Sequence, residues 1–412
     1  MLATLAWRNL WRNKGRTLIV MSAIAFSYGL MLVMFGIAQD SYRQMGDSIV
    51  EAVGGHILVH GEGYWEMPTG GQRVADPERL RADLEAMTEV EAVASRVMGY
   101  GLLGTARTSE GAQIMGVVPE QEEAFLGLRD RLVEGELLSD ERRSPIVIGQ
   151  EDAHRLGVEI GDRLVVTGSE RDGDVTRGLF YVDGILESVP GQVGEATAYV
   201  HLEELQELLG YGQGVTQVGI RLGDASMRHA VVERLRDQWS DEEEALEVLS
   251  WDEAVPEFQA LIDLDQGFTI LYLMVIIVIV VLGITNTFMM AVMERIREIG
   301  LLNALGMEPR RIGAMLMYET IFLAILGMGA GLMMGLGVHS YVANQGIDMS
   351  AMFDEEIEMS GIAMDMVIYS HIEVGWWVVG SLVVFVSICL SALYPAYRAS
   401  QKAPAEAMRF HE

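Results

Sequence analysis

Four stretches of this 412-residue sequence are long, apolar and almost free of charged side chains. They cover residues 18–38, 268–292, 314–338 and 374–394. A helix needs about 20 apolar residues to cross the hydrocarbon core of a bilayer, and each stretch is long enough. A helix on the surface of a soluble core would keep a polar stripe, which these stretches lack. The sequence therefore predicts an α-helical membrane protein with four transmembrane helices, one followed by three.

The first apolar stretch has two interpretations. It follows four basic residues, as the apolar core of a secretory signal peptide does, and cleavage is one alternative. It is, however, longer than the roughly 7–15 apolar residues of such a core. Residues 1–17 also place Trp7 and Trp11 one helical turn apart among arginines, as in an amphipathic helix on a membrane surface. We therefore predict a retained anchor that follows a cytoplasmic amphipathic helix.

The distribution of charge predicts the orientation. Basic residues near membrane helices mark the cytoplasmic side, and they occur in residues 1–17, 293–313 and 395–412. Residues 339–373 hold no Lys or Arg, and residues 39–267 hold 46 acidic against 18 basic residues. We expect both termini in the cytoplasm of a bacterium and the 39–267 and 339–373 segments outside the inner membrane. This excess of acid disfavours nucleic-acid binding, because phosphates need a basic surface.

Residues 39–267 are numerous enough for one or two compact units with their own core. Short β-branched or aromatic runs bounded by Gly, Asp or Ser predict strands, and Asp76 followed by Pro77 predicts the start of a helix over 79–93. The other expected elements are strands at 57–59, 146–148, 164–166 and 179–182 and short helices at 151–156 and 202–209, with the acidic run 237–244 as a solvated helix end. The segment is therefore predicted to be a large α+β periplasmic domain between the first two spans.

Motifs for catalysis and metal binding are absent from the sequence. It contains neither the G-x-x-x-x-G-K-[ST] loop that cradles nucleotide phosphates nor H-E-x-x-H. His56 and His60 lie four residues apart around a predicted strand, which keeps them far apart, so we interpret them as ordinary polar positions. Cys389, the single cysteine, is interpreted as an apolar packing residue. No catalytic residue, metal ligand or cofactor is therefore expected in this chain.

Glycines of the third stretch predict close helix packing. Gly327, Gly331 and Gly335 recur every four residues and share one helix face. Such a face lets two helix backbones approach closely, within one subunit or across a dimer. Asn286 and Glu319 are polar exceptions in the apolar stretches, and we interpret them as residues that bond between helices or lie near the membrane interface.

Three blocks of the sequence carry a family resemblance. The first is Met293–Gly306 (MERIREIGLLNALG), and the second is Tyr394–Ser400 with Pro404–Arg409. The third is Ile146–Gln150, followed by Ala153, by Leu156-Gly157-Val158 and by Gly161-Asp162. Together these blocks resemble the FtsX-like permeases of the ABC transporter superfamily, which include MacB, LolC and LolE. The order of one span, a large outer segment and three spans is also similar to that family.

The resemblance implies that residues 293–313 form a coupling helix region seated in a groove of a separate P-loop ATPase. Two copies of that ATPase would bind ATP and Mg²⁺, and a second permease copy or a related permease would complete a dimer. The residues expected to carry the coupling are Glu294, Arg295, Arg297, Glu298, Ile299, Gly300 and Leu302. Ile299, Leu301 and Leu302 are expected to anchor the segment to the partner or the bilayer surface. A plain cytoplasmic hairpin is the alternative, but membrane orientation alone needs only the arginines and not the interleaved glutamates.

Within the family the resemblance leaves several functions open. The Trp-containing segment 249–253 is similar to the LolC and LolE branch, which implies release of lipoproteins from the inner membrane toward the outer membrane, with a periplasmic carrier as a further partner. The alternatives are efflux of amphiphilic or peptide substrates, as in MacB, and control of cell-wall hydrolases, as in FtsX. A membrane-anchored receptor or scaffold is the alternative outside the family.

A lipidated cargo would enter between the first two spans, because these flank the outer domain. The residues expected to line this candidate cargo cavity are Met31, Met34 and Phe35 of the first span and Phe268, Leu271 and Met274 of the second. Methionine side chains adapt to varied acyl chains. Contact with bulk lipid is the alternative role of these six side chains.

Overall fold

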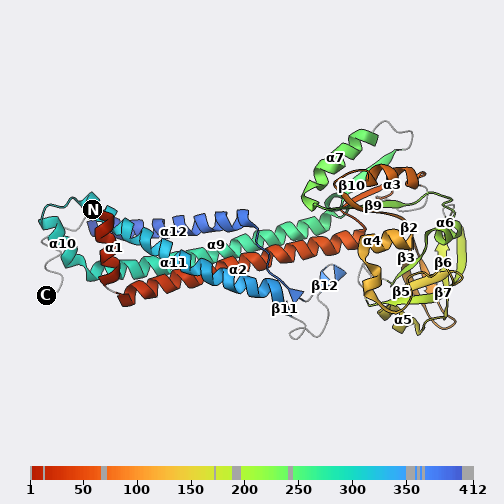
Figure 1. Ribbon diagram of the computed structural model, residues 1–412, viewed down its shortest axis with the longest axis horizontal. Coiled ribbons are helices and arrows are strands. Elements are labelled where there is room, and N and C mark those ends of the chain that lie inside the picture. Colours follow the sequence, from red (N-terminus) through yellow and green to blue (C-terminus); the bar gives the residue numbers. More distant parts are fainter. Residues whose placement is uncertain are drawn as a thin grey trace. The chain divides into compact units, whose positions relative to one another are not determined.

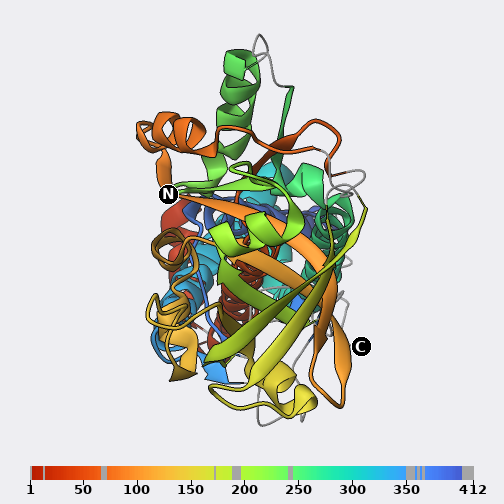
Figure 2. The same cartoon turned by 90° about the vertical axis from the view of Figure 1, so that its right-hand side faces the viewer.

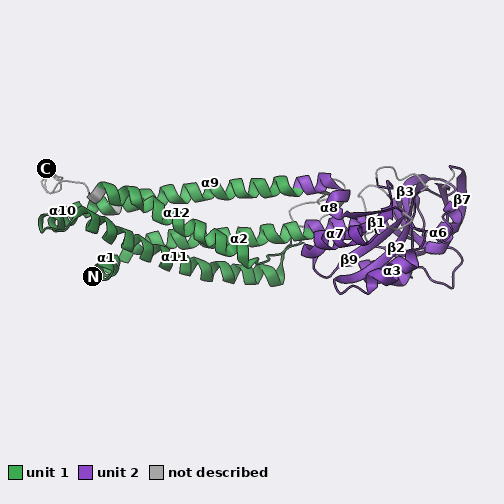
Figure 3. Cartoon of the chain, turned by 90° about the horizontal axis from the view of Figure 1, so that it is seen from above, with its two compact units in different colours: residues 1–44, 262–355, 365–412 green, residues 45–261, 356–364 purple. Residues whose placement is uncertain are grey.

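The computed structural model describes residues 2–12, 14–65, 72–170, 173–187, 196–239, 245–348, 358–359, 362–363 and 367–400. The chain forms two compact units (Figure 3). Unit 1 comprises residues 1–44, 262–355 and 365–412, and unit 2 comprises residues 45–261 and 356–364. The Pro404–Arg409 block, residues 240–244 of the acidic run and most of the acidic residues between 349 and 366 lie outside the described residues.

The helices of unit 1 include all four predicted apolar stretches (Figure 1). The helices are α1 (Leu2–Arg12), α2 (Lys14–Val53), α9 (Pro256–Glu294), α10 (Ile296–Ala304), α11 (Pro309–Gln345) and α12 (Val374–Ser400). Of these, α2, α9, α11 and α12 are long and apolar enough to cross a membrane. The far end of α2 and the first turns of α9 belong to unit 2, so both helices continue well beyond the apolar stretches. Hydropathy marks only the residues at bilayer depth, whereas a helix can continue in polar surroundings.

Unit 2 is built on a ten-stranded mixed sheet in the order β10-β1-β9-β2-β3-β8-β5-β7-β4, with β6 joining β2 to β7 (Figure 2). Its strands are β1 (Ile57–Gly61), β2 (Val90–Gly104), β3 (Ser109–Val117), β4 (Leu132–Gly135), β5 (Pro145–Gly149), β6 (Arg163–Ser169), β7 (Val175–Leu186), β8 (Ala196–His201), β9 (Gln217–Leu222) and β10 (Leu246–Ser250). Because β6 pairs with both β2 and β7, the strands β2, β3, β8, β5, β7 and β6 close into a ring. Buried side chains of these strands, such as Leu103, Ile148 and Val166, belong to one apolar core.

Short helices accompany the sheet. They are α3 (Pro77–Glu85), α4 (Pro119–Leu126), α5 (Gln150–Leu156), α6 (Leu202–Leu209), α7 (Arg228–Trp239) and α8 (Trp251–Ala254), with 3-10 turns η1 (Leu128–Arg131) and η2 (Ala225–Met227). Two-residue strands form two small ladders, β11 (Ile347–Asp348) with β14 (Val367–Ile368) and β12 (Glu358–Met359) with β13 (Ile362–Ala363). The four predicted strands and the two predicted short helices are confirmed as parts of β1, β5, β6 and β7 and of α5 and α6.

The predicted helix over 79–93 is wrong in its second half. The helix begins as expected, with the Asp76 side chain accepting from Arg79 N and Pro77 in the first turn, but it ends at Glu85. Val90 already belongs to β2, and Val93 pairs with Ile220 of β9. Apolar residues spaced by three fit a helix locally, but the pairing available to β-branched residues in the sheet decides the outcome.

Two side chains of the sheet bind the carboxyl end of α2 within unit 2. Arg96 Nη1 donates to Gly54 O at 2.6 Å, and Gln217 Nε2 donates to Val53 O at 3.1 Å. Arg96 is fully buried, and its Nη2 lies 2.8 Å from a carboxylate oxygen of the equally buried Glu122. These bonds satisfy carbonyl groups that a helix end leaves without an intrahelical partner, and they fix the end of α2 to the sheet.

Candidate functional site

The segment predicted to couple to an ATPase forms a short helix between two breaks. Arg295, with φ −102° and ψ 11°, separates α9 from α10. Gly306 has φ +93°, a conformation that favours glycine, and it follows the end of α10. All seven residues assigned to coupling lie between Glu294 and Leu302. Their side chains divide into a buried group and an exposed group.

Ile299 and Gly300 are buried, and Arg295 is largely enclosed, with 11% of its side-chain surface accessible. The Arg295 guanidinium lies 2.9 Å from a carboxylate oxygen of Glu319 on α11 and also donates to Asn9 O of α1 at 3.0 Å. Ile299 packs in an apolar cluster with Ile312 and other residues of α9, α11 and α12. The structure therefore uses Arg295 and Ile299 to hold α10 in place, and neither side chain lies on an open surface.

Glu294, Arg297 and Glu298 are exposed, and Leu302 is half-buried. Glu298 forms an ion pair with Arg12 at the end of α1. The bond from Glu298 raises the pKa of the Arg12 guanidinium above its usual range. This pair and the Arg295–Asn9 bond connect α1 with the α10 segment at two points.

The exposed apolar residues of this segment are Leu301, with 57% of its surface accessible, and Leu305, with 76%. Arg297, Leu301 and Leu305 follow one another at four-residue spacing and therefore lie along one side of the helix. We call these three residues the coupling face. Leu301 is one of the residues that the sequence predicts at a contact, whereas Leu305 is not among them. Its four-residue spacing from Leu301 is the signal that could have found it.

The predicted glycine face of α11 packs against α2. A Cβ atom built on Gly331 would lie 2.6 Å from Ala25 O, and one on Gly327 would lie 2.8 Å from Ile24 Cβ. A Cβ on Gly335 would lie 3.3 Å from Gly29 O, whereas a Cβ on Gly329 would have no neighbour within 4 Å from other elements that the structure describes. The helices approach closely on one side of α11 within a single subunit.

The structure does not join the other predicted residues into one site. Asn286 is exposed on α9, whereas the glycine face of α11 packs against α2. Met31 is buried beside Gly380 of α12, and Met34 and Phe35 are half-buried. Each of the three residues predicted on the second span has more than half of its surface accessible: Phe268, Leu271 and Met274. Of the six candidate cargo residues, only Met31 lines the narrow apolar gap among α2, α9 and α12.

The two histidines flagged by the sequence have structural surroundings. Burial lowers the pKa of both His56 and His60 to about 4. Leu222 N donates to His56 Nδ1 at 3.2 Å, and His60 Nδ1 lies 2.8 Å from Thr216 O. Across the described residues, no group of three His, Cys, Asp or Glu side chains is arranged to hold a metal ion.

Family models match both units of the chain. The model described as MacB-like periplasmic core domain matches residues 17–238, and the model described as FtsX-like permease C-terminal matches residues 270–404. The first match alone covers more than half of the sequence.

Two curated relatives match over almost their whole length. The lipoprotein-releasing system transmembrane protein LolC of Neisseria meningitidis is 22% identical over 96% of this chain and 94% of that protein. LolE of Haemophilus influenzae is 22% identical over 95% of this chain and 94% of that protein. The ABC transporter permease YtrF of Bacillus subtilis is 40% identical, but only over 18% of this chain and 16% of that protein.

Solved structures were also matched. The match to the extracellular domain of the ABC-type transporter YknZ from Gram-positive bacteria covers 47% of this chain and 99% of that domain, with 15% identity and a TM-score of 0.33. The match to the periplasmic region of MacB from Actinobacillus actinomycetemcomitans covers 49% of this chain and 92% of that region, with 13% identity and a TM-score of 0.35. With four membrane-length helices, a mixed α and β domain and both family models matched, the chain belongs to the FtsX-like ABC transporter permeases that carry a MacB-like periplasmic core domain.

Proposed function

We propose that this permease releases lipoproteins from the inner membrane toward the outer membrane, with ATP hydrolysis supplied by a separate subunit. The observation that carries the proposal is the similarity to LolC and LolE across nearly the whole chain, including both the helices and the α+β domain. The names of those relatives describe lipoprotein release. The alternative function is efflux of another amphiphile, and photo-crosslinking distinguishes it from lipoprotein release.

We assign ATPase docking to the coupling face formed by Arg297, Leu301 and Leu305. An exposed apolar pair beside a fixed charge is suited to a partner groove, because burial of both leucines would stabilise the complex and the arginine would set its register. Two ATPase copies with ATP and Mg²⁺ would serve two permeases, either identical or related. Arg295 and Glu298 would act one step away, by holding α10 against α11 and α1.

Movement reaches the α+β domain through α2 in this proposal. Lys14–Val53 is one helix, and its last carbonyl groups are bound by Arg96 and Gln217 of the sheet. A shift of that helix would therefore pull on β2 and β9 without a flexible linker between them. The charge distribution supports cytoplasmic termini and a periplasmic domain.

Cargo contact is assigned to the exposed side of α9 that carries Phe268, Leu271 and Met274. Spacing of three places these side chains on one face, where acyl chains can reach them. Met31 is less suited to first contact, because it is already packed against α12.

Photo-crosslinking tests the proposal. A crosslinker at Leu271 is expected to capture an acylated protein from cells, and ATP turnover is expected to reduce that capture. Gly337 on α11 supplies the matched control position, because a Cβ atom built there would have no neighbour within 4 Å from other elements of the described chain. Capture of phospholipid alone at Leu271, with or without ATP, would replace lipoprotein release by efflux of another amphiphile.

A further inference from the structure

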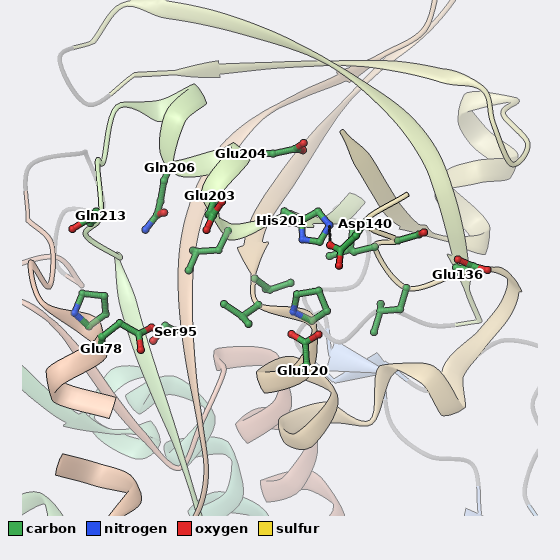
Figure 4. Close-up of a pocket in the computed structure, with 18 of the residues that line it drawn as sticks. Glu78, Ser95, Glu120, Glu136, Asp140, His201, Glu203, Glu204, Gln206 and Gln213 are labelled. Atoms are coloured by element: carbon green, nitrogen blue, oxygen red, sulfur yellow. Dashed lines mark ion pairs between the residues drawn. The ribbon is translucent and has the colours of Figure 1, made fainter. Parts of the chain in front are cut away.

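A large cleft in unit 2 lies among the amino-terminal turns of α3, α4 and α6 and the segment that follows β4 (Figure 4). Its volume is about 1420 Å³. Pockets for small molecules typically measure roughly 300–1,000 Å³, so this cleft has room for a longer ligand. Apolar side chains, among them Val117, Leu137 and Leu202, line it together with polar ones.

Carboxylates dominate the charged groups of the cleft. They are distributed around it, from Glu78 on one side to Glu136 on the other (Figure 4). The acidic lining residues are Asp76, Glu78, Glu120, Glu136, Asp140, Glu203 and Glu204, and the basic ones are Arg129 and His201. His201 lies 3.8 Å from Asp140, and Glu78 pairs with Arg81 outside the lining. The cleft therefore has a strong excess of negative charge.

Helix ends explain only part of this charge. Carboxylates in the first turn of a helix are favoured by its dipole, and Glu78, Glu120 and Glu203 occupy such positions in α3, α4 and α6. Glu136 and Asp140 belong to no helix, since both follow β4 in an irregular segment. Their presence beside the same cleft has no explanation in helix stability.

Two buried polar atoms of the lining lack a hydrogen-bond partner in the described part of the chain, which indicates that a ligand binds there. Ser95 on β2 is only 2% accessible, and its Oγ has no hydrogen-bond partner in the described part of the chain. Glu204 Oε2 is likewise buried without a partner there. A buried polar atom without a hydrogen-bond partner is unfavourable, so a ligand that donates N–H groups to these two acceptors would satisfy them.

We propose that this cleft binds a lysine- and arginine-bearing segment of a partner polypeptide. Cationic side chains meet the carboxylates of Glu136, Asp140 and Glu203, and N–H donors of the segment reach Ser95 Oγ and Glu204 Oε2. The apolar lining accepts the aliphatic stems that lysine and arginine present below their charged ends. A second copy of this chain does not fit, because residues 39–267 carry 46 acidic against 18 basic residues and would repel their own kind. The proposal does not depend on lipoprotein being the cargo.

Peptide binding to the full chain in detergent tests this proposal. The probe is a fluorescent peptide of alternating lysine and leucine. The control is a fluorescent peptide of alternating glutamate and leucine. Fluorescence anisotropy is expected to show binding of the lysine peptide only, with an affinity that falls as salt rises. The double variant Glu136→Gln/Asp140→Asn is expected to weaken binding about tenfold.

The matched control is Asp174→Asn/Glu233→Gln, which removes the same charge from exposed positions outside the cleft. It is expected to bind the lysine peptide as the native chain does. A photoreactive lysine peptide is further expected to label residues 117–120, 136–140 or 201–204. Equal loss of affinity in the two double variants, or labelling confined to other surfaces, would overturn the proposal and leave only general attraction to an acidic domain.

Discussion

The Arg295 guanidinium and the Glu319 carboxylate form a buried ion pair, 2.9 Å apart, with 11% and 8% of their side-chain surfaces accessible. Arg295 also donates to Asn9 O, so this one side chain connects α1, α11 and the break before α10. Removing one partner of a buried pair leaves an uncompensated charge and typically costs about 3–5 kcal/mol. Glu319→Ala is therefore expected to lower the thermal midpoint of the detergent-solubilised protein by several degrees.

The matched control for Glu319→Ala is Glu308→Ala, which removes the exposed partner of Arg311. Exposed pairs contribute about 0–1 kcal/mol, so its midpoint is expected to stay close to the native value. Arg295→Met combined with Glu319→Leu is expected to recover most of the loss, because no lone charge remains buried. Equal midpoints for the two single variants would show that the pair has no structural role.

Gly331→Leu is expected to disrupt the contact between α11 and α2, whereas Gly329→Leu is expected to be tolerated. A side chain at Gly331 would meet Ala25 O at 2.6 Å, and one at Gly329 would enter open space. Forcing the backbones apart would remove close packing along several turns. Yield and thermal midpoint in detergent measure the difference. If both variants behaved alike, close approach at this glycine face would not matter for stability.

Leu305→Asp is expected to prevent association with the ATPase while the permease stays folded. Leu305 is 76% accessible, so a carboxylate there disturbs no internal contact, but it would place a charge in the partner's groove. Co-purification of the ATPase and its stimulated hydrolysis are the measurements. Native values for both would exclude Leu305 from the docking surface.

Glu298→Lys is expected to weaken the same association by a different route. The positive charge of the new lysine would repel Arg12, whose ion pair with Glu298 connects α1 to α10 in the native chain. The charge swap Arg12→Glu/Glu298→Lys is therefore expected to restore ATPase binding. Failure of the swap, with the single variant defective, would place Glu298 in direct contact with the ATPase and remove the structural role assigned to it.

Protonation of His60 is expected to destabilise unit 2 as pH falls. Burial lowers its pKa to about 4, against about 6.5 in an unfolded chain. As pH falls, the unfolded state therefore binds the proton before the folded state does. The free energy of unfolding is constant above about pH 6.5 in this respect and decreases by up to roughly 3 kcal/mol between about pH 6.5 and 4. His60→Asn keeps a donor for Thr216 O and cannot become charged. Its thermal midpoint is expected to fall less steeply over this range than that of the native chain, and parallel curves would contradict the assignment.

The apolar stretches predicted the four long helices because hydropathy reports directly on bilayer depth. The same signal could not extend α2 to Val53 or start α9 at Pro256, because those turns lie in polar sequence. Local spacing predicts helix at residues 90–93, where the structure has a strand, because pairing with β9 is a long-range property that local spacing does not contain.

The candidate coupling site was predicted as a segment, but its inner and outer sides were not. Ile299 and Leu301 are both apolar and two residues apart, so only the packing of α10 against Ile312 shows which one is buried. The role of Arg295 depends on Glu319, a partner 24 residues away that sequence could identify only as a polar exception. The glycine face could be predicted from the sequence, because glycines at four-residue spacing share the side of a helix that can approach another helix closely.

Release of a lipoprotein from proteoliposomes tests the central claim most directly. The vesicles would contain this permease, the ATPase that co-purifies with it and a fluorescent triacylated lipoprotein, with a soluble lipid-binding carrier outside. Addition of ATP is expected to transfer the lipoprotein to the soluble fraction, a non-hydrolysable analogue is expected to leave it in the membrane, and Leu305→Asp is expected to abolish transfer. ATP hydrolysis at the native rate with all lipoprotein retained in the vesicles would contradict lipoprotein release as the function of this permease.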